Sequence, residues 1–274
     1  MSEHQFETHE PVKLYVELGA GTVAVRAEET TESRVQVTGR DADRVMVDLE
    51  GDHLSVIAPK DRAGFLGGDR KLDIEITVPT DSRLQTKTGS ADLAARGHFS
   101  DTHVKTGSGD VLVDTVTGKC LVETGSGDVQ LTAVEQELRI KSGSGDVMIG
   151  RAGATVSIST GSGDVKIDTA DGPTVVKTGS GDFKVTEAQA DIAMSTGSGD
   201  LVIGTANRGR VTAKGASGDV HVGIPAGVPV WTDVSTVSGR IRSSLTGAGE
   251  PEDGADYVEL RAKTVSGDIV LTEK

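Results

Sequence analysis

Carboxylates that recur at a fixed spacing are the first candidates for chemistry in this chain. The triplet Ser-Gly-Asp returns with a constant period through the middle of the sequence. If the repeats stack about 5 Å apart, neighbouring carboxylates repel each other by roughly 0.9 kcal/mol at most in water, and a calcium ion could relieve that repulsion. The series is therefore a candidate cation ladder, made of Asp110, Asp128, Asp146, Asp164, Asp182 and Asp200.

A structural role for the same aspartates is the alternative that we favour. Calcium-binding turns of other β-solenoids follow the pattern G-G-x-G-x-D, whereas here the aspartate directly follows the glycine and the turn occurs once per repeat. An aspartate in a turn can accept hydrogen bonds from the backbone amides of that turn. Lysines five residues earlier would support it, namely Lys87, Lys105, Lys141 and Lys177. We expect no cofactor, with calcium as the alternative.

Hydroxyl groups form two further series at the same period. A serine nucleophile needs an adjacent base, and no histidine recurs with the serines, so we expect these serines only to stabilise turns. The threonines are expected to hydrogen-bond from one repeat to the next. The serines are Ser108, Ser126, Ser144, Ser162, Ser180 and Ser198, and the threonines are Thr88, Thr106, Thr124, Thr160, Thr178 and Thr196.

The remaining reactive side chains are scattered. Among six histidines only His98 and His103 are near each other, and no set has the spacing of a zinc site. Cys120 falls in an apolar series, which predicts a buried, inert thiol. Trp231 lies where the repeat period breaks, so we expect it to cover the core, with an exposed contact residue as the alternative.

The elements that must position these residues are short strands. Apolar residues stand one and three positions after each aspartate, as in Val165 and Ile167, with Lys166 between them. Such alternation is typical of a half-buried strand. A second apolar series precedes each turn, as in Ile158 and Val176, and no segment has helical spacing.

One repeat cannot bury its own apolar face, but stacked repeats can. The sequence therefore predicts an all-β fold, a single-stranded parallel β-solenoid (β-helix) with about 18 residues per coil, which we take to be right-handed. Gly-Ser-Gly-Asp would form the sharpest corner, because glycine adopts positive φ without strain.

The repeat is expected to run through one continuous domain, residues 1–274. Residues 1–84 would form the N-terminal coils and cap, 85–224 the regular repeats, and 225–274 irregular C-terminal coils with an acidic loop at 246–256. The spacing loosens in the last part, where Asp219, Arg240 and Asp268 follow at progressively longer intervals. Residues 257–274 are expected to supply the final strands, 60–71 a mobile loop, and Gly51-Asp52 a degenerate corner.

Composition excludes several classes of partner. The net charge of −14 repels nucleic acid, whose binding depends on basic patches. No apolar run of about 18 residues is present, so we expect no membrane insertion. The first residues are acidic and lack an apolar stretch typical of a signal peptide, which favours a cytoplasmic location.

Three stretches resemble one bacterial β-strand-repeat family. They are LDIEITVPTDSRLQTKTGSADL, the iterated TGSGDV and the closing KTVSGDIVLTEK. From about residue 12 the chain resembles the adhesin-labelled family catalogued as domain of unknown function 4097. The resemblance implies a β-solenoid, implies links to the bacterial envelope and envelope stress, and carries over no catalytic residue.

These observations favour a non-catalytic structural or protein-binding module rather than an enzyme. The expected partner is a protein, with the chain itself as one candidate. The alternatives are an adhesin-like or envelope-stress-associated binding protein and a cation-binding or self-assembling scaffold.

Overall fold

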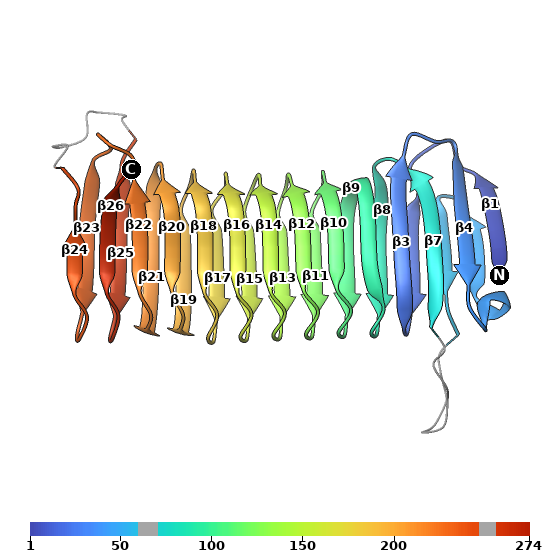
Figure 1. Ribbon diagram of the computed structural model, residues 1–274. Coiled ribbons are helices and arrows are strands. Elements are labelled where there is room, and N and C mark those ends of the chain that lie inside the picture. Colours follow the sequence, from blue (N-terminus) through green and yellow to red (C-terminus); the bar gives the residue numbers. More distant parts are fainter. Residues whose placement is uncertain (60–70, 247–255) are drawn as a thin grey trace, which may run out of the picture. The chain divides into compact units, whose positions relative to one another are not determined.

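The computed structural model describes residues 1–59, 71–246 and 256–274 (Figure 1). Within these ranges the chain forms two compact units, Met1–Gln136 and Glu137–Lys274. The expected mobile loop at 60–71 and acidic loop at 246–256 lie almost wholly outside the described residues. A single domain over the whole chain stays a prediction.

Over its described residues, the N-terminal unit consists of strands and one short 3₁₀ helix. They are β1 (Ser2–Glu7), β2 (Lys13–Leu18), β3 (Gly21–Glu28), β4 (Glu32–Thr38), η1 (Ala42–Arg44), β5 (Met46–Glu50), β6 (His53–Ile57), β7 (Leu72–Pro79), β8 (Ser82–Thr88), β9 (Asp92–Thr106), β10 (Val111–Val116), β11 (Cys120–Thr124) and β12 (Val129–Val134).

The C-terminal unit, over its described residues, is built from strands. They are β13 (Leu138–Ser142), β14 (Val147–Ala152), β15 (Val156–Thr160), β16 (Val165–Ala170), β17 (Thr174–Thr178), β18 (Phe183–Ala188), β19 (Ile192–Ser198), β20 (Leu201–Ala206), β21 (Gly209–Ser217), β22 (Val220–Ile224), β23 (Val230–Thr236), β24 (Ile241–Ser243), β25 (Val258–Thr264) and β26 (Ile269–Glu273).

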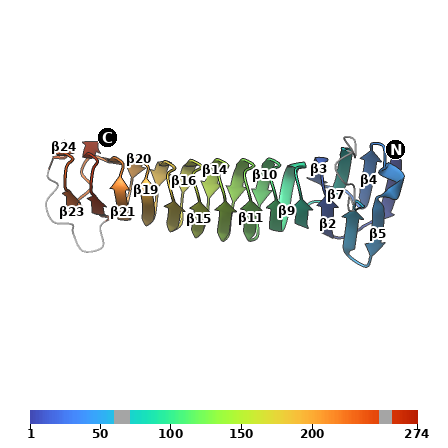
Figure 2. The same ribbon diagram turned by 90° about the horizontal axis from the view of Figure 1, so that it is seen from below.

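Each regular coil contains two strands and two turns, and equivalent strands of neighbouring coils pair in parallel. Val165 pairs with Phe183 and Phe183 with Leu201, while Thr174 pairs with Ile192 in the other sheet. Figure 2 shows β14 and β16 along one side of the unit and β15 along the other. The predicted all-β parallel solenoid is confirmed.

Alternation within the strands places the apolar ladders in the interior. Val165, Ile167 and Ala170 of β16 are at most 1% exposed, whereas Lys166 between them is exposed. The equivalent strand of the next coil, β18, repeats this pattern, so every coil covers the apolar face of its neighbour. Aliphatic and small side chains fill this narrow core, since the chain has only 3% aromatic residues.

The corner glycines are required for a reason other than the one the sequence suggested. Gly163, Gly181 and Gly199 do not have a positive φ. A Cβ at Gly181 would lie 2.1 Å from the carbonyl oxygen of Gly163, and one at Gly199 would lie 2.2 Å from that of Gly181. The expected positive φ is therefore wrong for these three corners, although the corner glycine Gly218 has a φ of +140°. Glycine is needed because successive coils pass too close to each other for a side chain.

The order of coils in the N-terminal unit differs from their order in the sequence. β2 pairs with both β6 and β8, and β3 pairs with both β7 and β9, so the coil of β2 and β3 lies between two later ones. Antiparallel strands then cover the coil of β6 and β7, because β5 pairs with β6, β4 with β7 and β1 with β4. Gly51-Asp52 turns the β5–β6 hairpin and is not a solenoid corner.

The C-terminal unit has a similar exchange. β25 pairs with β21 on one side and β23 on the other, and β26 pairs with β22 and β24. The last strands of the sequence are thus the penultimate coil, and the coil of β23 and β24 is the outermost one in this unit. Residues 257–274 do supply the last two strands of the chain, as expected, but these strands do not form the outermost coil.

Candidate functional site

The aspartate ladder lies on the corner of each coil and joins that coil to the next. Oδ1 of Asp164 accepts a hydrogen bond from the backbone N–H of Asp182 at 2.9 Å, and Oδ1 of Asp182 accepts one from Asp200 at 2.7 Å. From the sequence, the donor was expected to be a backbone amide of the aspartate's own turn. The structure corrects this, because stacking in register places the next coil's amide beside the carboxylate.

The other members of the ladder bond in the same way within each unit. The amide donors and carboxylate acceptors are Asp110 on Asp92, Asp128 on Asp110, Asp164 on Asp146, Asp219 on Asp200 and Asp268 on Asp219. One oxygen of each accepting carboxylate is therefore used to hold two coils together.

In the C-terminal unit the ladder ends at the coil that carries Arg240 in place of the aspartate. The backbone N–H of Arg240 donates to Oδ1 of Asp268 at 2.8 Å, and this bond, followed by the charge of the guanidinium, lowers the pKa of Asp268. The coil that carries Arg240 is the outermost one in its unit, so no further described coil offers an amide to a carboxylate there. The replacement of the aspartate by Arg240 therefore marks the outermost coil in the sequence, although it was not recognised as such from the sequence alone.

Four of the six threonines before the corners bond within their own corner, namely Thr106, Thr124, Thr160 and Thr178. Oγ1 of Thr178 accepts the N–H of Gly181 at 2.9 Å, and Oγ1 of Thr124 accepts that of Gly127 at 3.0 Å. The expected repeat-to-repeat bonding is wrong for these four threonines, because each bonds to the glycine amide three residues later. Oγ1 of Thr88 and Oγ1 of Thr196 are buried and have no hydrogen-bond partner among the described residues. Thr236 in the outermost coil differs, since its Oγ1 donates to the backbone oxygen of Gly267 in the neighbouring coil at 3.0 Å.

The lysines before the corners are placed on the outer face of the strands. Nζ of Lys87 contacts Glu17 at 3.2 Å, and Nζ of Lys105 contacts Glu123 at 3.5 Å. Each pair joins equivalent positions of neighbouring coils. These two lysines support stacking through glutamates rather than through the aspartate ladder.

No three His, Cys, Asp or Glu side chains in the described ranges are grouped so that they could hold a metal ion. Cation binding by the aspartate ladder stays a prediction. The corner serines are exposed beside the aspartates, as Ser180 and Ser198 illustrate. Cys120 is 2% exposed, which confirms its predicted burial, and this burial raises the pKa of its thiol to about 12.

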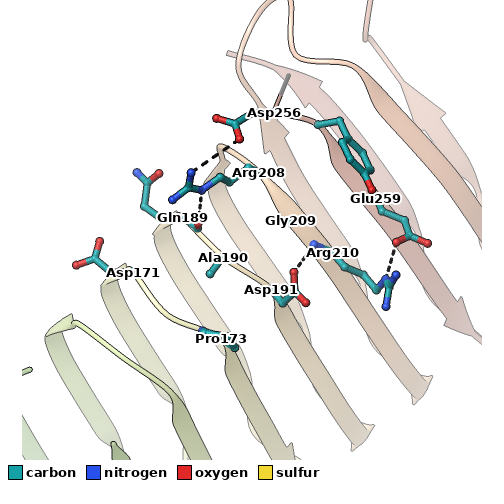
Figure 3. Close-up of a pocket in the computed structure, with 11 residues that line it drawn as sticks. Asp171, Pro173, Gln189, Ala190, Asp191, Arg208, Gly209, Arg210, Asp256 and Glu259 are labelled. Carbon is teal, nitrogen blue, oxygen red and sulfur yellow. Dashed lines mark hydrogen bonds and ion pairs between the residues drawn. The ribbon is translucent and has the colours of Figure 1, made fainter. Parts of the chain in front are cut away.

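A polar groove of about 510 Å³ opens on the turns opposite the aspartate corners of the C-terminal unit (Figure 3). Nε of Arg208 donates to the backbone oxygen of Gln189 at 2.8 Å, and its guanidinium lies 3.8 Å from Asp256. The groove is lined by Asp171, Pro173, Gln189, Ala190, Asp191, Arg208, Gly209, Arg210, Asp256, Tyr257 and Glu259.

Ion pairs occupy the wall of this groove. Nε of Arg210 contacts Glu259 at 2.5 Å, and its backbone N–H donates to Asp191 at 2.8 Å. The hydrogen bond from Arg210 is the main reason that the pKa of Glu259 lies below its ordinary value. The groove thus presents carboxylates that are already held by guanidinium or amide groups.

Next to the groove, an aromatic ring lies on the outer face. Trp231 pairs with Glu259 across neighbouring strands, and the guanidinium of Arg261 lies 5.5 Å from the centre of its ring, at the distance of a cation–π contact. Trp231 is 51% exposed and Tyr257 is 49% exposed. The expectation that Trp231 covers the core is wrong, and its alternative, an exposed residue, is what the structure shows.

Sequence reasoning did not identify this groove, although one signal marked it. The interval between Val211 and its partner Ile192 is one residue longer than the interval between Ala206 and its partner Ala188. The extra residue therefore falls in the turn of Arg208 and Gly209, where Gly209 has a φ of +89°. Glu259 and Tyr257 reach this turn only because β25 lies next to β21.

No helix in the described ranges is long and apolar enough to cross a membrane. The family model called Toastrack DUF4097 matches residues 12–272. No curated protein matches the chain significantly.

The chain is similar to solved structures, of which the first described here shares its fold. One from Bacteroides fragilis, described as a "putative adhesin", is 17% identical, with a TM-score of 0.51, and the match covers 78% of this chain and 96% of that one. Another from Parabacteroides distasonis, described as a "putative lipid binding protein", is 13% identical, with a TM-score of 0.47, and the match covers 98% and 96%.

Proposed function

We propose, for a chain that belongs to the toastrack DUF4097 family, a role as a non-catalytic module that binds a protein through its last coils. The resemblance seen in the sequence predicted membership of this family, and the match over residues 12–272 confirms it. The similar structures described as adhesins fit the broad class of binding proteins, and their fold is what this chain shares with them.

The observation that carries the proposal is the pair of exposed aromatic rings beside arginines. We call Trp231, Tyr257, Arg210 and Arg261 the aromatic–arginine patch. Trp, Tyr and Arg are the residues that most often dominate the binding energy of protein interfaces. Elsewhere the outward positions of the regular strands carry residues such as Lys166 and Lys184, which are poor anchors.

The groove beside the patch supports positioning of a partner rather than acid–base catalysis. A glycosidase-type site needs one carboxyl whose pKa is raised so that it can act as an acid. Glu259 has its pKa shifted the other way by Arg210, and Asp191 accepts a backbone amide. Arranged in this way, the charged groups provide a fixed surface that a partner's polar groups can match.

The test compares capture of partners by two double variants. Trp231→Ala with Tyr257→Ala removes both rings of the patch, whereas Met148→Ala with Val175→Ala removes two exposed apolar side chains elsewhere in the same unit. Immobilised protein is incubated with an extract of the source cells, and bound proteins are identified by mass spectrometry. We expect a partner that the wild type and the Met148–Val175 variant retain and the Trp231–Tyr257 variant loses.

Equal capture by all three proteins would refute the patch as the binding surface. Cell fractionation tests the location separately. The cytoplasmic location stays a prediction, and recovery of the protein outside the cytoplasmic membrane would favour the adhesin-like alternative.

A further inference from the structure

The outermost coil of the C-terminal unit exposes two strand edges at once. β23 pairs only with β25 and β24 only with β26 among the described residues, so the other edge of each strand is unpaired (Figure 1). Unpaired edges present rows of free N–H and C=O groups that can pair with another strand. These two edges belong to different sheets, and the interior of the solenoid lies between them.

The interior of this coil is also uncovered. Ile241 is 49% exposed, whereas Ile269, its partner in the neighbouring coil, is fully buried. Val234 is half-buried and Thr232 is exposed, while their partners Ala262 and Leu260 are fully buried. Burying these side chains would stabilise any complex that closes the coil, in proportion to the apolar area removed from water.

A second copy of this coil fits the surface in a way that a single peptide does not. One extended peptide could pair with β23 or with β24, but it would leave the other edge and the interior open. A coil of the same kind presents two edge strands at the same spacing, with an apolar interior between them. It can therefore satisfy both edges and cover Val234 and Ile241 together.

Charges on the outer faces select one arrangement of the two copies. Asp233 points outward from β23, since it lies between the inward Thr232 and Val234, and Arg242 points outward from β24, since it follows the inward Ile241. A two-fold axis perpendicular to the sheets would place each of these charges against its own copy. An axis parallel to the strands instead places β23 of one copy beside β24 of the other.

We propose that two chains associate through their outermost coils, with β23 of each copy pairing antiparallel to β24 of the other. A two-fold axis parallel to the strands keeps each residue at its own height, and the corner of residues 237–240 leaves Thr236 level with Ile241. Thr236 of one copy then lies opposite Ile241 of the second copy, and Val234 lies opposite Ser243. On the outer face, Asp233 is the diagonal neighbour of Arg242. This register keeps apolar side chains inside and opposite charges outside, since facing residues of paired strands share a side of the sheet. The contact is isologous, so it closes at a dimer and does not form a filament.

This surface is separate from the aromatic–arginine patch, so the dimer does not depend on the proposed function. Trp231 and Tyr257 are not among the residues that face the second copy, whereas the dimer uses the free edges of β23 and β24, their inward side chains and the outward charges of Asp233 and Arg242. The Trp231–Tyr257 variant should lose partner capture and keep the dimer. A variant that loses the dimer should keep capture, and the two proposals can therefore fail independently.

Light scattering coupled to size exclusion, run over a concentration series, gives the first test. We expect the mass to rise to twice the 28.3 kDa of the chain. Asp233→Arg and Arg242→Asp each place like charges together and should raise the dissociation constant roughly tenfold or more. The double variant exchanges the charges and should restore the dimer, which a folding defect could not do.

Disulfide crosslinking tests the register itself. With Ser235→Cys and Arg242→Cys in one chain, oxidation should link two copies, because these residues face each other in the proposed register and facing residues of antiparallel strands lie within disulfide range. The two cysteines of one copy lie on opposite outer faces and cannot link to each other. Cys120 is buried, so it adds no background.

A monomer at every concentration would overturn the proposal, and would show that the short, arginine-flanked β24 edge prevents pairing. A dimer that neither charge reversal weakens, or in which residues 235 and 242 fail to crosslink, would overturn the proposed arrangement.

Discussion

The outermost coils of the two units differ in how they are covered. In the N-terminal unit, β5 and β4 pair antiparallel with the coil of β6 and β7, and Val35 and Val37 of β4 are fully buried. In the C-terminal unit, the coil of β23 and β24 has no such cover among the described residues, and Ile241 is half exposed. A reversal of strand direction ends a parallel ladder, whereas a coil that simply stops leaves its edges available for pairing.

The largest expected effect comes from matched isoleucines in the two outermost coils. Ile74 in β7 is 1% exposed and Ile241 in β24 is 49% exposed. Ile74→Ala should reduce the free energy of unfolding by about 2–5 kcal/mol, the usual range for a buried isoleucine. Ile241→Ala should cost less than about 1 kcal/mol in dilute protein, where the proposed dimer is absent.

Urea denaturation of both variants measures this difference. Equal losses in dilute solution would show that the outermost coil of the C-terminal unit is covered after all. A cost of Ile241→Ala that increases with protein concentration would instead support the dimer.

The close approach of regular coils predicts the next largest effect. Gly181→Ala would place a Cβ 2.1 Å from the backbone oxygen of Gly163, so the coils must separate, at a cost of about 3 kcal/mol. Ser180→Ala, one residue earlier on the exposed corner, is the matched control and should change stability by less than about 0.5 kcal/mol. Thermal or urea unfolding gives both values, and a neutral Gly181→Ala would contradict the proposed packing role of the corner glycines.

Removing one member of the aspartate ladder should have a smaller effect. Asp182→Ala leaves the amide of Asp200 without its acceptor, and we expect a loss of about 1–2 kcal/mol. Arg240→Ala, at the same position of the outermost coil, should be close to neutral, because no described amide bonds to its side chain. Similar costs for both variants in urea unfolding would show that the corner side chain does not act through the next coil's amide.

Acid should destabilise the groove wall in a way that depends on Arg210. The pKa of Glu259 is lower in the folded chain than its ordinary 4.5, chiefly because of the hydrogen bond from Arg210. Its contribution is therefore complete above the unfolded pKa and is lost as the pH falls through the folded one. Between about pH 6 and about pH 3, the melting temperature of the wild type should fall further than that of Arg210→Met. Parallel curves for the two proteins would contradict this linkage.

The smallest expected effect is that of calcium. Because one oxygen of each accepting aspartate already holds the neighbouring coil, millimolar calcium or EDTA should leave the melting temperature and the mass unchanged. A calcium-dependent rise in either one, measured by differential scanning fluorimetry and light scattering, would revive the cation ladder as the functional site.

Much of the fold followed from the period of the sequence. Equal spacing of Val165, Phe183 and Leu201 places them in one ladder, because residues one period apart stack in any solenoid. The sequence placed the aspartates at the corners correctly, but it did not identify the backbone amide that each one accepts. A turn considered alone contains only its own amides, whereas the donor belongs to the neighbouring coil. The groove could not be predicted, because Arg210 and Glu259 are far apart in the sequence and meet only across β21 and β25.

The sequence by itself determined the repeat, the inward ladders, the buried Cys120 and the family. These depend on local alternation and on a constant period, which need no knowledge of neighbours. Tertiary structure alone decided which coil is outermost, why the corners need glycine, and how Trp231 and Glu259 come together. Those features depend on contacts between segments far apart in the chain, and at both ends of the sequence the spatial order of coils differs from the order in which they are read.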